Sequence, residues 1–391
     1  MKLRHLFPVH CTAVLLSLGL LLSGVGPNSD AQPAEAPGPT ASTVSTSSAS
    51  EPVHAVAAAE EDKVKVDKNT EAIINGALKY LASQQMPDGS WIGDKNNPAS
   101  SKYAVAMTSY VMMAFLANGN LPDAGPYAKQ VKNGLQFLLD SVQSDGTFRE
   151  GARAQYMYSH GLGTMVLAEV YGETQSPLIR PKLEHTVLLI IHGQNPEGGW
   201  RYQPGSKDAD ISVTVPQTVA LCAAKRAGIA VPQLTIDKAV AYIKRCSAGT
   251  TGGFSYQADK GGPGFARTAA AIYALQISGL YDDRMVADGS RFVMQTISKS
   301  GEPGWSGTEW MCYGNYYAGV AHYLIGGDRW KDYYQTFGQQ YLVTHVSSEG
   351  DMRYWSETLD PRAKGIGSNW PTAVFTTILS LPYGYLPLYQ R

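Results

Sequence analysis

A short turn in which glycine precedes an aromatic residue recurs along this chain at nearly constant spacing. The aromatic residues of these turns are Trp91, Phe148, Trp200, Phe254, Trp305 and Tyr354. Successive members are 57, 52, 54, 51 and 49 residues apart. A regular period of this size is typical of repeat proteins, in which each unit buries its apolar face only against its neighbours. The sequence therefore predicts six repeats that fill residues 67–391.

Each turn is flanked by two kinds of helix. The segment before the turn is amphipathic, as in 77–85, where apolar residues follow the spacing of a helix with one solvent-facing side. The segment after the turn is rich in Ala and Thr and almost uncharged, as buried helices are. These buried helices are expected at 105–117, 158–170, 212–225, 268–277, 316–325 and 372–381. We expect an all-α fold, an α/α toroid of six inner and six outer helices, with an open superhelix of helix pairs as the alternative.

The N-terminus has the features of an export signal. Basic residues at its start precede an apolar stretch over 13–25, and a run of small residues ends at Ala31. This order predicts a signal peptide over 1–31. The protein is therefore expected to be exported, to the periplasm or outside the cell. Membrane association is expected only through an N-terminal segment that stays uncleaved.

A linker is expected between this signal and the repeats. Residues 32–66 are rich in Pro, Ala, Ser and Thr and contain almost no large apolar side chain, so they bury too little surface to offset the entropy of ordering. The sequence predicts a disordered linker over 32–66 and the toroid domain over 67–391.

The overall charge excludes one class of function. Thirty-two basic and 33 acidic side chains give a net charge of -1, which offers no electrostatic footprint for nucleic acid. Only 17% of the residues are charged, against about 25% in an average soluble protein, which favours a large core or a large apolar cavity.

The three cysteines beyond the signal, Cys222, Cys246 and Cys312, allow at most one disulfide, and buried free thiols are the expectation.

Two of the turns resemble a known repeat. Residues 80–91 and 194–200 carry the order helix, Gln, then Gly-x-Trp or Gly-Gly-Trp, which resembles the repeats of squalene and terpene cyclases. In that family the Gln pairs with the turn backbone and the aromatic ring packs over a neighbouring helix end. The chain is also similar to exported bacterial proteins built of prenyltransferase and squalene oxidase repeats, which share the ending at 385–391. The resemblance implies the toroid of terpene cyclases and prenyltransferase β-subunits, and it implies no particular activity.

One segment resembles a cyclase acid motif. Squalene–hopene cyclases protonate an alkene with the middle Asp of Asp-x-Asp-Asp-Thr, and the segment 208–212 keeps Asp208 and Asp210 but has Ile211 and Ser212 after them. The resemblance implies Asp210, with Asp208, as the candidate catalytic acid. Since an alkene is a very weak base, the missing third acid counts against this activity. The alternative is that Asp210 caps the helix that begins at Ile211.

A second segment resembles a zinc site. Residues 311–319 are similar to the stretch around the zinc cysteine of protein prenyltransferases, which would be Cys312 here. Trp310 stands where that family has its Asp ligand, and Asn369 and Trp370 stand where its His falls. Because two ligands are replaced, we expect no metal and no cofactor, and His322 is interpreted as a helix-face residue.

Several side chains are expected near a central cavity. Alignment of the inner helices places Thr108, His160, Thr214, Thr268, Tyr317 and Thr372 at similar depth. In a closed toroid they would form a ring at the cavity mouth, alongside Tyr158, Arg267, Tyr313 and Tyr316. Trp310 and Trp370 are further candidates for ligand binding, as aromatic platforms. The alternative for the hydroxyl groups is a hydrogen bond to the preceding helical turn.

Three functions are consistent with these observations. The leading hypothesis is an exported toroid that binds an apolar, isoprenoid ligand in its cavity with no intact catalytic motif. The second is a divergent isoprenoid cyclase of the squalene–hopene type, an isomerase or lyase that uses Asp210. The third is a protein-interaction or carbohydrate-binding module whose partner is an envelope protein or a sugar, although sugar cleavage would require paired carboxylates.

Overall fold

The computed structural model describes residues 64–150, 155–299, 310–362 and 365–390. The chain divides into two units, Met1–Val53 and His54–Arg391, and every residue described below belongs to the second. The predicted signal peptide and nearly all of the predicted linker lie outside the described residues. Within the described ranges, no helix has the length and apolarity needed to cross a membrane.

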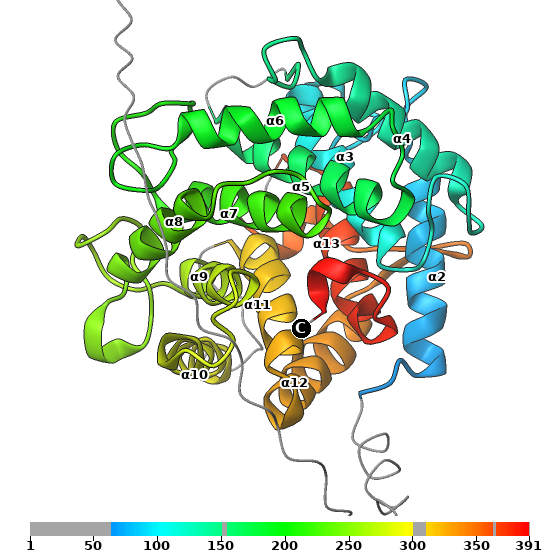
Figure 1. Ribbon diagram of the computed structural model, residues 1–391. Coiled ribbons are helices and arrows are strands. Elements are labelled where there is room, and N and C mark those ends of the chain that lie inside the picture. The colour runs from blue at the N-terminus through cyan, green and yellow to red at the C-terminus, as the bar shows by residue number, and fades with distance from the viewer. Residues whose placement is uncertain (1–63, 151–154, 300–309, 363–364, 391) are drawn as a thin grey trace, which may run out of the picture. The chain divides into compact units, whose positions relative to one another are not determined.

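Six helices whose residues are nearly all buried form an inner ring. They are α3 (Ala104–Leu116), α5 (Tyr156–Thr174), α7 (Ile211–Arg226), α9 (Phe265–Ile277), α11 (Met311–Ile325) and α13 (Asn369–Ser380). Each packs against the next along the chain, and α13 packs back against α3 (Figure 1). This last contact closes the ring, so the repeats form a toroid and the open superhelix is excluded.

The outer helices surround this ring and carry one buried stripe each. They are α2 (Lys68–Ser83), α4 (Ala128–Ser141), α6 (Arg180–Gly193), α8 (Gln233–Arg245), α10 (Arg284–Lys299) and α12 (Gly327–Tyr333). A π-helical segment, Tyr334–Leu342, continues α12. The strands β1 (Ser347–Glu349) and β2 (Met352–Tyr354) form an antiparallel hairpin before α13, with Ser347 opposite Tyr354.

The third turn shows how one repeat is held to the next. The backbone N–H of Trp200 donates to the Thr214 hydroxyl on α7 at 3.1 Å, and its indole N–H donates to the Ile190 carbonyl on α6 at 2.8 Å. The Gln194 amide donates to the Gly198 carbonyl and to a carbonyl in the first turn of α8, both at 2.9 Å. One turn thus joins an inner helix and two outer helices, and the Gln pairing is the one that the family resemblance implies.

The same threonine contact recurs around the ring. The turn N–H groups of Trp91, Phe254 and Trp355 donate to Thr108, Thr268 and Thr372 at 2.9, 2.9 and 3.1 Å. In the second repeat the Phe148 N–H donates to the Tyr156 hydroxyl at 2.7 Å instead. A buried turn N–H needs a partner, and the inner helix supplies it in each of these five turns.

The sixth turn differs from the sequence expectation. Trp355, and not Tyr354, is the buried aromatic residue, and its indole N–H donates to the Leu342 carbonyl at 2.8 Å. Tyr354 is half-buried and stacks on Tyr80, with 5.0 Å between the ring centroids. The fifth turn, predicted at 304–305, lies outside the described residues.

This correction predicts a difference between two neighbouring substitutions. Trp355→Ala removes a fully buried ring and should lower the free energy of unfolding by about 4 kcal/mol. Tyr354→Ala removes a half-buried ring and should cost less than half of that. Urea unfolding of both variants checks the assignment, and an equal or reversed order of the two losses would restore Tyr354 as the turn residue.

Candidate functional site

The inner ring surrounds a cavity of about 580 Å³. All six inner helices contribute to its wall, through residues such as Met107, Tyr158, Ser212, Arg267, Tyr313 and Trp370. Six tyrosines line it: Tyr103, Tyr110, Tyr158, Tyr202, Tyr256 and Tyr313. Two tryptophans, Trp310 and Trp370, join them, and no Asp or Glu stands among the described lining residues. The volume falls within the range of about 300–1,000 Å³ that small-molecule sites occupy.

A second layer of tyrosines lies directly behind part of this wall. Tyr316 packs edge-on against Tyr110 with 5.4 Å between the ring centroids, and Tyr317 contacts Tyr313 at 4.9 Å. The hydroxyls of Tyr316 and Tyr389 are 2.8 Å apart, which brings the C-terminal segment into this layer. Burial raises the pKa of Tyr316 and Tyr317 well above the usual value, so these phenols are neutral at pH 7.

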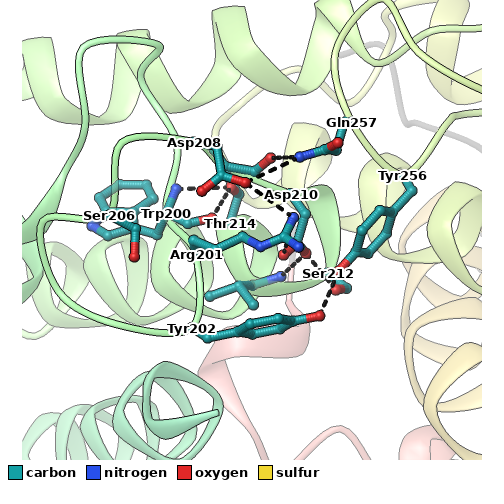
Figure 2. A network of polar contacts seen from close by, with 12 residues as sticks. Trp200, Arg201, Tyr202, Ser206, Asp208, Asp210, Ser212, Thr214, Tyr256 and Gln257 are labelled. Carbon is teal, nitrogen blue, oxygen red and sulfur yellow. Dashed lines mark hydrogen bonds and ion pairs between the residues drawn. The ribbon is translucent and has the colours of Figure 1, made fainter. Parts of the chain in front are cut away.

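Polar side chains gather at the start of α7, as Figure 2 shows for Asp210, Ser212 and Tyr256, and Ser212 and Tyr256 line the cavity there. The Ser212 hydroxyl donates to Asp210 at 2.5 Å and lies 2.6 Å from the Tyr158 hydroxyl, while Tyr313 donates to the Ser212 carbonyl at 3.1 Å. The hydroxyls of Tyr202 and Tyr256 form a second pair at 2.6 Å. This side therefore presents hydroxyl groups to the cavity, with one carboxylate behind them.

Asp210 is fully buried and caps α7, as the alternative interpretation of the sequence predicted. Its side chain accepts the Val213 N–H at 3.0 Å, and the Arg201 guanidinium lies 3.4 Å from its second oxygen. Burial raises the pKa of Asp210 above its usual value, although hydrogen bonds from Ser212 and Val213 and the charge of Arg201 oppose this shift. Asp210 is not a lining residue, because Ser212 stands between it and the cavity.

Arg201 holds the acids of this turn outside the cavity. Besides its contact with Asp210, the Arg201 guanidinium lies 3.6 Å from a carboxylate oxygen of Asp208, whose side chain is 59% exposed. The Arg201 guanidinium packs over the rings of Tyr202 at 4.7 Å and Tyr256 at 5.4 Å, behind the wall that these tyrosines form. Neither carboxylate of the cyclase-like segment therefore lines the cavity.

Two further buried carboxylates have the same structural role as Asp210. Glu150 accepts the Val105 N–H at the start of α3 at 3.1 Å, and Asp360 accepts the Cys312 N–H at the start of α11 at 2.9 Å. A carboxylate at a helix N-terminus satisfies free N–H groups and stabilises the positive end of the helix dipole. Cys312, the residue at the zinc-like position, is a buried free thiol, as are the two other cysteines beyond the N-terminal segment.

The predicted ligand-binding residues divide into two groups. Arg267, Trp310, Tyr313 and Trp370 line the cavity, as does Tyr158. Tyr316 and Tyr317 lie in the second layer described above. His160, Thr214 and Thr268, which were expected with Thr108, Tyr317 and Thr372 in a ring at the cavity mouth, are buried and are not lining residues. The two threonine hydroxyls accept the turn N–H groups of Trp200 and Phe254. The His160 ring bonds to the Tyr156 hydroxyl at 2.9 Å and to the Thr186 carbonyl at 3.0 Å.

Several lining residues that were not predicted carry a usable signal in the sequence. Tyr202 and Tyr256 each stand two positions after a turn aromatic, Trp200 and Phe254. A tyrosine two positions after a turn aromatic is therefore the signal that could have found both residues. Arg362 and Ile366 line the cavity from the segment before α13 and have no such signal.

Comparison with known sequences gives a partial match. No protein-family model matches the chain. The chain is 23% identical over 146 residues to the lanosterol synthase erg7A of Aspergillus fumigatus. The matched segment covers 36% of this chain and 17% of that enzyme. The match therefore spans about one sixth of the length of the enzyme.

Solved structures show the fold. The chain resembles a cellobiose 2-epimerase from Bacillus thermoamylovorans with a TM-score of 0.59 and 14% identity, over 82% of this chain and 99% of that chain. It resembles the α-1,6-mannanase GH76A of Salegentibacter sp. with a TM-score of 0.60 and 8% identity, over 81% and 100%. It resembles the type II terpene cyclase MstE from Scytonema with a TM-score of 0.55 and 13% identity, over 82% and 100%. The chain thus shares the α/α toroid of terpene cyclases, as its turns implied, and shares it with two sugar-acting enzymes.

Proposed function

We propose that this α/α toroid binds an apolar, isoprenoid molecule in its central cavity and does so without transforming it. The observation that carries the proposal is the composition of the wall: six tyrosines and two tryptophans around about 580 Å³, with no carboxylate among the described lining residues. Export, expected from the N-terminal sequence, would bring this cavity to the lipids of the cell envelope.

The physical basis of the proposal is the exposure of aromatic surface to a confined space. Removing apolar surface from water contributes roughly 25 cal/mol per Å². Rings that inner helices hold in place lose little conformational freedom when a ligand binds. More of the free energy of burying apolar surface therefore contributes to affinity. A related structure of MstE contains geranylgeranyl dihydroxybenzoate as its substrate, which makes a geranylgeranyl compound a suitable first probe.

The placement of the acids supports binding over reaction. A group that protonates an alkene must reach it, and Ser212 lies between Asp210 and the cavity. Sugar cleavage usually requires two carboxylates on opposite sides of the bond, about 5–9.5 Å apart. Asp208 and Asp210 instead lie on one turn and share Arg201. The cyclase with Asp210 as its acid and the carbohydrate module therefore remain rival proposals with weaker support.

The proposal is tested by filling the cavity. Ala106 lines it from α3, so Ala106→Trp places a large ring in the ligand space. In native mass spectrometry with geranylgeraniol, the unmodified protein should bind one molecule per chain, and Ala106→Trp should weaken binding at least about tenfold, or about 1.4 kcal/mol. Ala241→Trp, on the exposed face of α8, is the matched control and should bind normally.

Two results would overturn the proposal. One is a lack of geranylgeraniol binding to the unmodified protein. The other is equal binding by Ala106→Trp, which would place the ligand on the outside of the toroid, as a protein-interaction module would. Formation of a cyclised product by the unmodified protein would favour the rival cyclase.

A further inference from the structure

The polar side of the cavity determines which polar group a ligand can carry. We infer that Tyr158 and Ser212 form a subsite that accepts a hydrogen bond from a hydroxyl group of the bound molecule. This inference rests on the proposed function, since it names the head group of the ligand that the aromatic wall would hold. It is carried by the directions of the hydrogen bonds on this side, which can be worked out one proton at a time.

The direction of the first bond is fixed at Asp210. Its Oδ1 accepts the Val213 N–H at 3.0 Å and lies 2.5 Å from the Ser212 hydroxyl. A carboxyl oxygen that carries no proton can only accept, so Ser212 donates its only proton to Oδ1 of Asp210. This direction holds whether or not the other oxygen, Oδ2, carries a proton.

The direction of the second bond follows from the first. The hydroxyls of Tyr158 and Ser212 are 2.6 Å apart, so one of them donates to the other. Because the proton of Ser212 points to Asp210, the donor is Tyr158. The third hydroxyl on this side, that of Tyr313, donates to the Ser212 carbonyl at 3.1 Å. The protons of Tyr158, Ser212 and Tyr313 are therefore used within the protein, apart from the separate pair that Tyr202 and Tyr256 form.

At Tyr158 and Ser212, only lone pairs are then left to face the cavity. Tyr158, Ser212 and Tyr313 all line it, and the oxygen of Tyr158 still has capacity to accept a hydrogen bond. A hydrocarbon or an ether bound here would exclude water and leave this acceptor unpaired, which costs about 1–3 kcal/mol. An alcohol would supply the missing proton. The pair thus selects a ligand that donates, and it rejects an equally apolar ligand that only accepts.

Two kinds of molecule present this chemistry. A lipid alcohol has one hydroxyl and an apolar chain, while a sugar has several hydroxyls and an apolar face that can stack on Trp310 or Trp370. The six tyrosines and two tryptophans of the wall favour the lipid alcohol, whereas the lining residues Arg267, Arg362 and Gln155 suit a sugar as well. The experiment therefore includes a sugar so that the two are separated.

The test compares an alcohol with its methyl ether. Quenching of tryptophan fluorescence gives Kd for geranylgeraniol, geranylgeranyl methyl ether and cellobiose, with the double variant Tyr158→Phe/Ser212→Ala beside the unmodified protein. The unmodified protein should bind the alcohol about tenfold more tightly than the ether, which corresponds to about 1.4 kcal/mol. The double variant should bind both lipids alike, with its affinity for the ether unchanged or slightly higher. Tyr354→Phe, which removes a tyrosine hydroxyl that lies outside the cavity and stacks on Tyr80, is the matched control and should keep the tenfold preference.

Each other outcome has a definite meaning. Equal Kd values of alcohol and ether for the unmodified protein would overturn the hydroxyl subsite and leave the proposed cavity binding intact. Binding of cellobiose alone, weakened in the double variant, would support the subsite and overturn the apolar ligand. Absence of binding by all three probes would overturn both. A double variant that loses affinity for the ether as well would show that these residues act through the fold, and would also overturn the subsite.

Discussion

Gly198→Ala is expected to destabilise the protein by about 3 kcal/mol or more. Gly198 has φ +94°, a conformation that costs an alanine roughly 1–2 kcal/mol. A Cβ at this position would also lie only 2.4 Å from the Lys238 carbonyl oxygen of α8, a backbone atom that cannot turn aside. Overpacking of this kind adds about 1–3 kcal/mol. The two costs act together because the turn of one repeat touches the backbone of the next outer helix.

The same close approach occurs at three other turns. A Cβ at Gly89, Gly146 or Gly252 would lie 2.4, 2.4 and 2.8 Å from the carbonyl oxygens of Asn133, His185 and Asp288. Gly228 is the matched control, because it has φ +88° with nothing within 4 Å of a Cβ. Gly228→Ala should cost only about 1–2 kcal/mol. Urea unfolding of both variants measures the difference, and equal losses would show that the contact with α8 contributes nothing.

Glu169→Gln is expected to stabilise the protein above pH 7 by up to about 3 kcal/mol. Glu169 lies on α5, is 6% exposed and accepts the Leu388 N–H of the C-terminal segment at 3.3 Å. Burial raises its pKa from 4.5 to about 7, against the effects of this hydrogen bond and of the Arg226 charge. The buried neighbours Tyr273 and Tyr389 also face it, and their own pKa values are raised further by its charge.

The sign of the pH dependence follows from this raised pKa. Between pH 4.5 and about 7 the folded protein binds more protons at Glu169 than the unfolded chain does, so stability falls as the pH rises through this window. Glutamine keeps an oxygen for the Leu388 N–H but carries no charge. Urea unfolding should therefore give similar midpoints for the two proteins near pH 4.5 and a higher midpoint for Glu169→Gln at pH 8.

A nearby glutamate serves as the control for this experiment. Glu173 is exposed on the same helix, and its charge is the smallest of the effects on the pKa of Glu169. Glu173→Gln should therefore change stability little near pH 4.5 and raise it only slightly at pH 8. The account of Glu169 would be contradicted if Glu169→Gln shifted the midpoint equally at both pH values. It would also be contradicted if the unmodified protein were the more stable of the two at pH 8.

The repeats could be predicted from sequence because their signals are local. A glycine at positive φ and an aromatic residue that caps a helix end both act within one turn, so their spacing is visible in the chain. Closure of the ring is not local, since it depends on the contact between α13 and α3, whose residues are far apart in sequence. The prediction of closure came from the family resemblance, and the structure and its neighbours bear it out.

The direction of side chains on the inner helices could not be predicted from their depth. Ser212 and Thr214 are two residues apart on α7, and about 200° of rotation separates them on a helix with 3.6 residues per turn. Ser212 therefore faces the cavity, while Thr214 faces the turn at Trp200. Tyr158 and His160 on α5 are related in the same way. Alignment by depth placed Thr214 and His160 in the expected ring, because depth carries no information on rotation. Tyr158 was expected beside that ring, whereas Ser212 was not predicted.

The acids of the cyclase-like segment illustrate a second limit. An aspartate before a helix is a good cap and also a good acid, so residue type alone does not separate the two roles at Asp210. The contacts with Val213, Ser212 and Arg201 separate them, and they depend on how the turn at Trp200 folds. The sixth turn could have been assigned correctly, since Trp355 and Thr372 have the same separation as Trp91 and Thr108, 17 residues.

A crystal structure of the protein with geranylgeraniol would show whether the lipid lies in the central cavity. The account predicts density for one molecule inside the inner ring, with its chain against Trp370 and Tyr110. It also predicts a hydroxyl oxygen about 2.7–2.8 Å from the Tyr158 hydroxyl. Density for the lipid only on the outer helices, or a cavity that holds nothing but water at saturating geranylgeraniol, would contradict it.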